Sequence, residues 1–329
     1  MAHPYADTRP PRILLVKTSS LGDVLHNLPV VSDILRHLPN AQVDWLVEEG
    51  FAALPKLHPA VHTIIPVALR RWRGRLLNTN TWREMAAFRA ALSAQNYDIA
   101  IDTQGLFKSA LLMRSAHGLR CGFDRHSARE PLATILYQQT FPVATGQHAV
   151  ERNRQLVAQA LGYALEEPAD YGIKPPSIDH PEWLALGPYA VLLHATSRAD
   201  KMWGEPNWIA LGRYLHQRDI HSILPWGNET ERLRSQRLVA AIPGAVTPPR
   251  LNLREAAALL GGAHAVIGVD TGLAHLSAAL NVPTIGIYTA TDPTLTGLYA
   301  APRVINLGGI NRAPDVATVI DALQQVVTC

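Results

Sequence analysis

Cysteine is scarce in this sequence, and long apolar runs are absent. Only two of the 329 residues are cysteine, Cys121 and Cys329, and neither has neighbours at zinc-ligand spacing. No apolar run reaches the roughly 18 residues of a membrane-spanning helix. The first residues, MAHPYADTRPPR, lack the apolar core of a signal peptide, so we expect a short tail before the first strand. A disulfide framework is not expected, and a reducing compartment is favoured.

Several catalytic and ligand-binding motifs are also missing. The chain has no G-x-S-x-G, H-E-x-x-H, C-x-x-C or D-x-D pattern, and its 14 histidines are scattered. These absences argue against a serine hydrolase and a metal site, so no metal cofactor is expected. Without a D-x-D pair, an enzyme acting on nucleotide sugars would neutralise its leaving diphosphate with lysine and helix N-termini. No zinc-finger, helix-turn-helix or RNP-like pattern suggests nucleic acid as a partner.

Charge is unevenly spread along the chain. Residues 1–165 contain 18 Lys and Arg against 12 Asp and Glu, a net charge of +6, whereas residues 166–329 have a net charge of −3. The densest basic stretch is RRWRGR, residues 70–75. The first half is therefore predicted to meet an anion, although a solvated surface loop explains the basic stretch equally well.

Short apolar strand patterns alternate with helical patterns throughout, which predicts parallel sheets with crossover helices. The alternation is interrupted by a proline-rich stretch and then restarts. We therefore predict an N-terminal α/β domain over 1–165, a linker over 166–187 and a C-terminal α/β domain over 188–329. Whether the final helix packs back on the N-terminal domain is left open. Ligands of such doubly wound sheets bind beyond the carboxyl ends of the strands, so a cleft between the two halves is the expected site.

The first strand end carries the stretch KTSSLGDVLH, residues 17–26. Its hydroxyls and its position before a helix suit an anion, but it matches neither nucleotide-binding glycine motif. Asp23 could act in chemistry or, with Ser20, could cap the helix. Spacing alone favours capping, because a helix N-terminus lowers the pKa of a carboxylate and weakens it as a base.

Three later strand ends carry residues suited to a nucleotide diphosphate or its ribose. They are Thr196, Ser197 and Lys201; Asp270, Thr271, Gly272 and His275; and Glu231. Each group also has a structural reading: a hydroxyl turn with a surface lysine, an N-cap with a helix-face histidine, and an acid complementing a helix dipole. Asp and His are unfavourable choices between buried elements, which favours the functional reading for the second group.

Nine segments in order resemble glycosyltransferase family nine, the lipopolysaccharide heptosyltransferases, from about Arg12 to the final helix. They are LLVKTSSLGDVLHNLP, DWLVEEGFA, IPVALRRWR, IDTQGLFKSA, AREPLA, QHAVERNR, LHATSRADKMW, LPWG and VDTGLAHL. KTSSLGDVLH and RRWR match the first heptosyltransferase of the pathway rather than the second or third. The resemblance implies a GT-B fold, with two Rossmann-like doubly wound domains facing across a cleft.

The resemblance also implies an activity and a place for it. An inverting, metal-independent enzyme would move L-glycero-D-manno-heptose from ADP-heptose to the inner Kdo of Kdo2–lipid A. It would be cytoplasmic and peripheral on the inner membrane of a Gram-negative bacterium. Two alternatives remain: a related nucleotide-sugar enzyme, either a transferase with another acceptor or an epimerase, and a non-catalytic endotoxin-binding module.

Residues are carried over from the family by position. Asp23 matches the catalytic base, and Lys201 with Thr196 and Ser197 matches the donor-phosphate cluster. The donor-binding turn is matched by Asp270, Thr271, Gly272 and His275, and the ribose contact by Glu231. Acceptor anions would meet Arg70, Arg71, Arg73 and Lys108. The chain departs from the family at Ser197, at Gly204 and in the loop 288–293, which leaves the geometry of that loop open.

Overall fold

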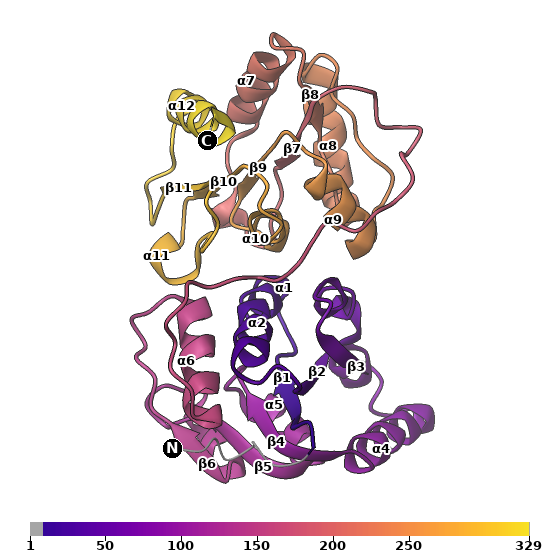
Figure 1. The fold of residues 1–329 in the computed structure, drawn as a ribbon. Helices are drawn as coiled ribbons and strands as arrows, with labels where there is room; N and C mark the ends of the chain where they lie inside the picture. The colour runs from indigo at the N-terminus through magenta and orange to yellow at the C-terminus, as the bar shows by residue number, and fades with distance from the viewer. Residues whose placement is uncertain (1–8, 329) are drawn as a thin grey trace. The chain divides into compact units, whose positions relative to one another are not determined.

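The computed structural model describes residues 9–328, so residues 1–8 of the expected N-terminal tail and Cys329 lie outside the described residues. The chain divides into two compact units, Met1–Gly172 and Ile173–Cys329 (Figure 1). The division falls inside the segment 166–187 that the sequence marks as a linker. Between residues 163 and 188 the described chain forms no helix or strand.

Unit 1 is built on a parallel sheet with the strand order β3-β2-β1-β4-β5-β6. Its strands are β1 (Arg12–Val16), β2 (Gln42–Glu48), β3 (Val61–Val67), β4 (Asn96–Asp102), β5 (His117–Phe123) and β6 (Gln139–Phe141). The central strand β1 reads RILLV and is buried almost throughout, as a strand covered on both faces must be. The order reverses between β1 and β4, and open α/β sheets bind ligands at such a point.

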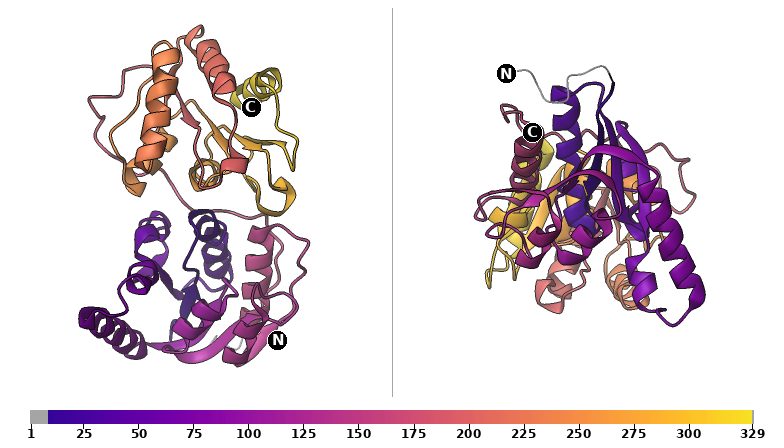
Figure 2. Two further views of the ribbon diagram at one scale, coloured as in Figure 1. Left: turned by 180° about the vertical axis from the view of Figure 1, so that it is seen from behind. Right: turned by 90° about the horizontal axis from the view of Figure 1, so that it is seen from below.

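Helices cover both faces of this sheet. They are α1 (Leu21–Leu25), α2 (Leu28–His37), α3 (Leu69–Arg73), α4 (Thr79–Ser93), α5 (Phe107–Met113) and α6 (Ala149–Leu161), with short 3₁₀ turns η1 (Glu49–Phe51), η2 (Pro55–Leu57) and η3 (Pro131–Leu136). Helix α2 packs against α6. Two alternate residues of β1, Leu14 and Val16, pack in a hydrophobic cluster with residues of α3, α4, α5 and η3. Figure 2 shows unit 1 from behind and from below, with α4 at its edge in both views.

Unit 2 has a parallel sheet of order β11-β10-β9-β7-β8. Its strands are β7 (Tyr189–Leu193), β8 (His221–Ile223), β9 (Ala265–Val269), β10 (Thr284–Tyr288) and β11 (Val304–Gly308). Its helices are η4 (Ala199–Lys201), α7 (Glu205–His216), α8 (Glu229–Ala241), α9 (Leu253–Gly261), α10 (Gly272–Ala279), α11 (Pro293–Thr296) and α12 (Val316–Thr328). The final helix α12 packs on β10, β11 and α7 of this same unit.

The helical pattern of DVLHNLPVVSDILRHL, residues 23–38, predicts one helix, and this prediction is wrong. The structure has two helices there, α1 and α2, joined at His26 and Asn27. Pro29 lies in the first turn of α2, where its missing N–H is tolerated; inside one longer helix it would remove a hydrogen bond. Among the described helices, none is both long and apolar enough to cross a membrane.

Candidate functional site

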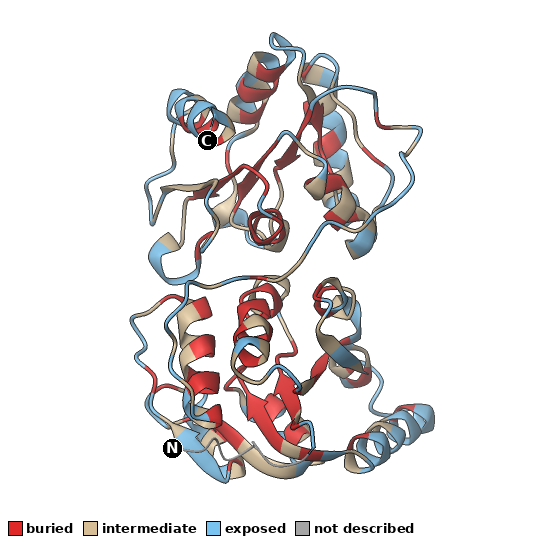
Figure 3. Cartoon of the chain, in the orientation of Figure 1, coloured by how far each residue is buried: buried red, intermediate tan, exposed pale blue. Residues whose placement is uncertain are grey.

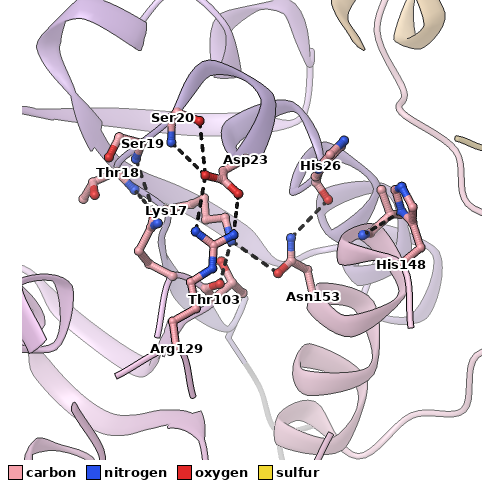
Figure 4. A network of polar contacts seen from close by, with 12 residues as sticks. Lys17, Thr18, Ser19, Ser20, Asp23, His26, Thr103, Arg129, His148 and Asn153 are labelled. Atoms are coloured by element: carbon pink, nitrogen blue, oxygen red, sulfur yellow. Dashed lines mark hydrogen bonds and ion pairs between the residues drawn. The ribbon is translucent and has the colours of Figure 1, made fainter. Parts of the chain in front are cut away.

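Asp23 lies where β1 gives way to α1, in the third position of that helix (Figure 4). Its Oδ2 atom accepts hydrogen bonds from the Ser20 backbone N–H at 3.0 Å and from the Ser20 hydroxyl at 3.2 Å. Its Oδ1 atom faces the guanidinium of Arg129 at 2.6 Å. The capping interpretation is therefore right for one oxygen, while the other is held by an arginine from a distant segment.

Two cations flank the Asp23 carboxylate. Burial acts to raise its pKa, but the charges of Lys17 and Arg129 outweigh burial and hold the pKa well below the usual range. Lys17 is itself buried, and its Nζ donates to the Thr103 carbonyl at 2.7 Å and to Asn153 Oδ1 at 3.4 Å. Burial lowers the pKa of Lys17 to about 8. Asp23 is therefore an ionised carboxylate at neutral pH, able to accept a proton but only weakly basic.

Residues at the end of β4 form hydrogen bonds with the turn that precedes Asp23. Gln104 Oε1 accepts the backbone N–H groups of Thr18 at 3.1 Å and Ser19 at 3.3 Å. Gln104 is in turn placed by Asp102, whose Oδ1 accepts the N–H of Gln104 at 2.8 Å. The other oxygen of Asp102 accepts the hydroxyls of Ser109 and Tyr137. Burial raises the pKa of Asp102 despite these bonds.

In unit 2, Asp270 is the centre of a polar cluster beyond the ends of β7, β9 and β10. Its Oδ2 accepts from Lys201 Nζ at 2.6 Å and from the Thr291 hydroxyl at 2.7 Å. His275 Nε2 lies 3.7 Å from its Oδ1, and the Thr196 hydroxyl donates to its backbone carbonyl at 3.0 Å. Burial acts to raise the pKa of Asp270, but hydrogen bonds from His275, Lys201 and Thr291 hold it well below the usual range.

This cluster adjoins the start of α10. Thr271 is the N-cap residue of α10, as the structural reading of this group has it, and its side chain makes no capping hydrogen bond. Gly272 is the first helical residue. The first N–H groups of a helix have no partner within it, and a lysine lies alongside, so the arrangement suits a phosphate or diphosphate.

Two residues predicted to bind the sugar donor, Ser197 and Glu231, take no part in the contacts around Asp270. Ser197 is exposed. Glu231 lies in the first turn of α8, where its carboxylate accepts the Gly227 N–H at 2.7 Å and the Asn228 amide at 2.8 Å. Glu231 is therefore placed to complement the dipole of α8, and its contact with a ribose stays a prediction.

The predicted acceptor residues lie on α3 and α5 of unit 1. Arg71 is bound by Glu49 and Glu84, with its Nη1 atom 2.6 Å from Glu84. The guanidinium of Arg70 lies over the ring of Phe51, 5.0 Å from its centroid. Arg73 and Lys108 are exposed, and within the described chain neither forms an ion pair. Arg71 is therefore committed to two carboxylates, while Arg73 and Lys108 are available to an anion.

Three residues of these clusters were not predicted as site residues. Arg129 lies in the segment AREPLA. It is 106 residues from Asp23 in the sequence, so residue spacing could not predict their contact. Lys17 reads simply as part of a turn. Thr291 belongs to the loop after β10 that departs from the family, and the rule that sites follow strand ends could have found it.

No three His, Cys, Asp or Glu side chains gather as metal ligands within residues 9–328. Unit 2 has a cavity of about 580 Å³ between residues 178–184 and α9. Of the predicted site residues, none lines this cavity. The polar clusters around Asp23 and Asp270, rather than the cavity, are therefore the candidate sites.

Comparison with known proteins extends this picture over nearly the whole chain. The chain is 48% identical over 295 residues to lipopolysaccharide heptosyltransferase 1 of Pseudomonas aeruginosa, covering 89% of this chain and 82% of that protein. The corresponding Escherichia coli K12 protein is 46% identical, covering 89% and 92%. The solved structure of E. coli heptosyltransferase WaaC with ADP matches with a TM-score of 0.88 at 42% identity, covering 96% of this chain and 99% of that one.

The predicted GT-B fold class is confirmed by this structural match together with the two parallel-sheet α/β units. The family model for glycosyltransferase family 9 (heptosyltransferase) matches residues 85–322, which is more than half of the sequence. The resemblance noted from nine short segments is thus confirmed. The chain belongs to glycosyltransferase family 9, the heptosyltransferases.

Proposed function

We propose that this chain transfers L-glycero-D-manno-heptose from ADP-heptose to the inner Kdo of Kdo2–lipid A, in assembly of the lipopolysaccharide inner core. The observation that carries the proposal is the match of 96% of the chain to E. coli heptosyltransferase WaaC, solved with ADP and with ADP-2-deoxy-2-fluoro heptose. The reaction takes place on the cytoplasmic face of the inner membrane of a Gram-negative bacterium, where the enzyme is peripheral.

On the donor side, the cluster around Asp270 receives the diphosphate. Lys201 and the N-terminus of α10 stabilise the negative charge that develops on ADP as it leaves. Lys201 is already paired with Asp270 at 2.6 Å, so the cation is held in place before the donor arrives. These groups supply the charge stabilisation that a metal would otherwise give, and the enzyme needs no metal cofactor.

On the acceptor side, Asp23 is the general base. It takes the proton from the Kdo hydroxyl as that oxygen attacks the anomeric carbon, with inversion, while the bond to ADP breaks. The pKa of Asp23 is low because Lys17 and Arg129 flank it, so the carboxylate is a weak base. A weak base suffices if the proton moves late, once the attacking oxygen has bonded to the sugar and become strongly acidic.

The proposal is tested by measuring ADP release from ADP-heptose with and without Kdo2–lipid A. Release that depends on the acceptor, with a heptosylated product, supports transfer. Endotoxin binding without ADP binding in calorimetry would identify the non-catalytic module instead. An isomerised sugar nucleotide would identify an epimerase.

The role of Asp23 is tested by Asp23→Ala. We expect turnover to fall by about 100-fold or more while affinity for ADP is unchanged, because the groups proposed to bind the diphosphate all belong to unit 2 and Asp23 belongs to unit 1. Asp321→Ala is the matched control, since Asp321 is exposed on α12. Near-normal turnover of Asp23→Ala would remove Asp23 from the role of base.

A further inference from the structure

The exposed large hydrophobic residues of unit 1 are gathered on one layer of helices. Seven of the described residues of this unit are large, hydrophobic and exposed: Leu76, Leu77, Trp82, Phe107, Leu111, Leu132 and Ile135. All seven belong to α4, α5, η3 or the α3–α4 turn. Among the described helices of this unit, none of the seven lies on α1, α2, α3, α6, η1 or η2.

These elements form one layer because they share a core. Trp72 of α3, Leu92 of α4, Met113 of α5 and Ala133 of η3 pack in a single cluster against one face of the sheet. Helix α5 also packs directly on η3. We call the solvent side of α3, α4, α5 and η3 the outer layer face. In Figure 3 helix α4 is mostly pale blue, which marks it as exposed.

The outer layer face is strongly basic. Residues 69–93, 107–113 and 131–136 contain seven Arg and Lys but only one acidic residue, Glu84. Glu84 is bound to Arg71 and to the indole N–H of Trp72. Within the described chain, none of Arg73, Arg75, Arg83 and Arg89 forms an ion pair. Free cations therefore stand among the exposed apolar side chains.

The α3–α4 turn is shaped to present apolar side chains to its surroundings. Leu77 is as exposed as a side chain can be, at 103% of its reference area. Trp82 is 58% exposed, and its indole N–H donates to the Leu76 carbonyl at 2.8 Å, which ties α4 back to the turn. Amphipathic rings beside arginines are typical of side chains that sit at the headgroup level of a bilayer.

We propose that the outer layer face docks on an anionic lipid bilayer, with Leu77, Leu132 and Ile135 entering the interface and the arginines contacting lipid phosphates. Charge complementarity selects this partner. Two copies of the chain meeting through this face would bring like charges together. Nucleic acid would leave the apolar side chains without a partner. The proposal rests on the proposed function for its lipid acceptor, but docking is measured without that acceptor.

The test is co-sedimentation of the full chain with vesicles of phosphatidylethanolamine and phosphatidylglycerol, and with vesicles of phosphatidylcholine alone. We expect binding to the anionic vesicles only, weakening as salt screens the charges. The triple variant L77S/L132S/I135S and the double variant R83E/R89E should each lower the vesicle partition coefficient by about tenfold or more. These side chains are exposed, so the fold is expected to tolerate the changes.

Matched controls are drawn from unit 2 and the linker. L186S/L233S/I310S removes three other exposed apolar side chains, and K174E/R213E reverses two other exposed cations. Both controls should bind vesicles within about twofold of the unchanged chain. Equal loss in the controls, equal binding to phosphatidylcholine, or no vesicle binding at all would overturn the proposal.

Heptose transfer to a soluble, deacylated acceptor separates the two proposals. All docking variants should keep this activity, because none of the substituted residues belongs to the Asp23 or Asp270 cluster. A chain that transfers heptose but ignores vesicles would overturn docking and leave the proposed function standing. A chain that binds anionic vesicles through this face but transfers no heptose would overturn the proposed function and leave docking standing.

Discussion

As the proposed general base, Asp23 is unusual because a cation lies against it. Arg129 contacts one of its oxygens at 2.6 Å, and Lys17 is a second, buried cation nearby. Both cations favour the charged form of the carboxylate, and together they outweigh its burial. The carboxylate is thus kept ionised and oriented, at the expense of basicity.

Replacing Arg129 should therefore change the pH dependence of the reaction. In Arg129→Gln the pKa of Asp23 rises, because burial is then opposed only by Lys17 and the hydrogen bonds from Ser20. A base works only when ionised, so activity is lost as pH falls through this raised pKa. We expect the acidic limb of the kcat profile to lie at higher pH in Arg129→Gln than in the unchanged enzyme. Arg125→Gln, an exposed neighbour, is the control. Parallel pH profiles would show that Arg129 does not set the pKa of Asp23.

Lys201 presents a comparable case on the donor side. Its removal leaves the Asp270 carboxylate without its cation, in the region expected to hold the diphosphate. Lys201→Met should weaken ADP binding in calorimetry by about tenfold or more, from lost attraction and added repulsion. Lys201→Met with Asp270→Asn should recover part of that loss, because the repelling charge is gone. A change in acceptor affinity alone would contradict the assignment, and Lys174→Met serves as the neutral comparison.

At the scale of elements, α2 and α6 are joined by a buried ion pair. Arg154 contacts Asp33 through two hydrogen bonds, of 2.7 and 3.1 Å, and both side chains are at most 3% exposed. Arg154 also donates to the Glu167 carbonyl, which ties the chain after α6 to this pair. Such a pair is sensitive to removal of one partner, because the other is left as a buried charge.

Arg154→Ala should lower the free energy of unfolding of unit 1 by about 3–5 kcal/mol, measured by urea denaturation. Asp33→Leu with Arg154→Met should recover most of this, since no charge remains buried. Arg36→Ala is the matched control: Arg36 also faces Asp33, but at 3.5 Å and 37% exposed, so a change below about 1 kcal/mol is expected. An equal effect of the two single substitutions would contradict the burial argument.

At the scale of the whole molecule, each unit carries a hydrophobic core of its own. Residues 163–188 join the units without forming a helix or strand. Glutamyl endopeptidase should therefore cut the native chain first in this segment, after exposed Glu166 or Glu182, and leave two compact fragments. Mass spectrometry identifies the cut, and Glu166→Gln with Glu182→Gln should slow it. Early cleavage inside unit 1 or unit 2 instead would contradict this division.

Composition and local pattern alone determined much of this protein. Buried strands such as RILLV and AVIGV are predictable from the sequence, because a parallel strand covered on both faces must be apolar. The polar residues that follow them were therefore predictable as site candidates. The motifs in order were specific enough to indicate the family before any contact was known.

Local pattern failed where the deciding partner is distant in sequence. Strand β5, HGLRCGF, has no alternating pattern, and Gly122 is needed there because a side chain would collide with the ring of Tyr137. The pairings of Asp23 with Arg129, of Asp270 with Lys201 and Thr291, and of Gln104 with the turn at Thr18 are all long-range contacts. The sequence alone identified residue types that can ionise and donate. Only the tertiary structure decided which charges face each other, because electrostatic interactions depend on distance and burial rather than on position along the chain.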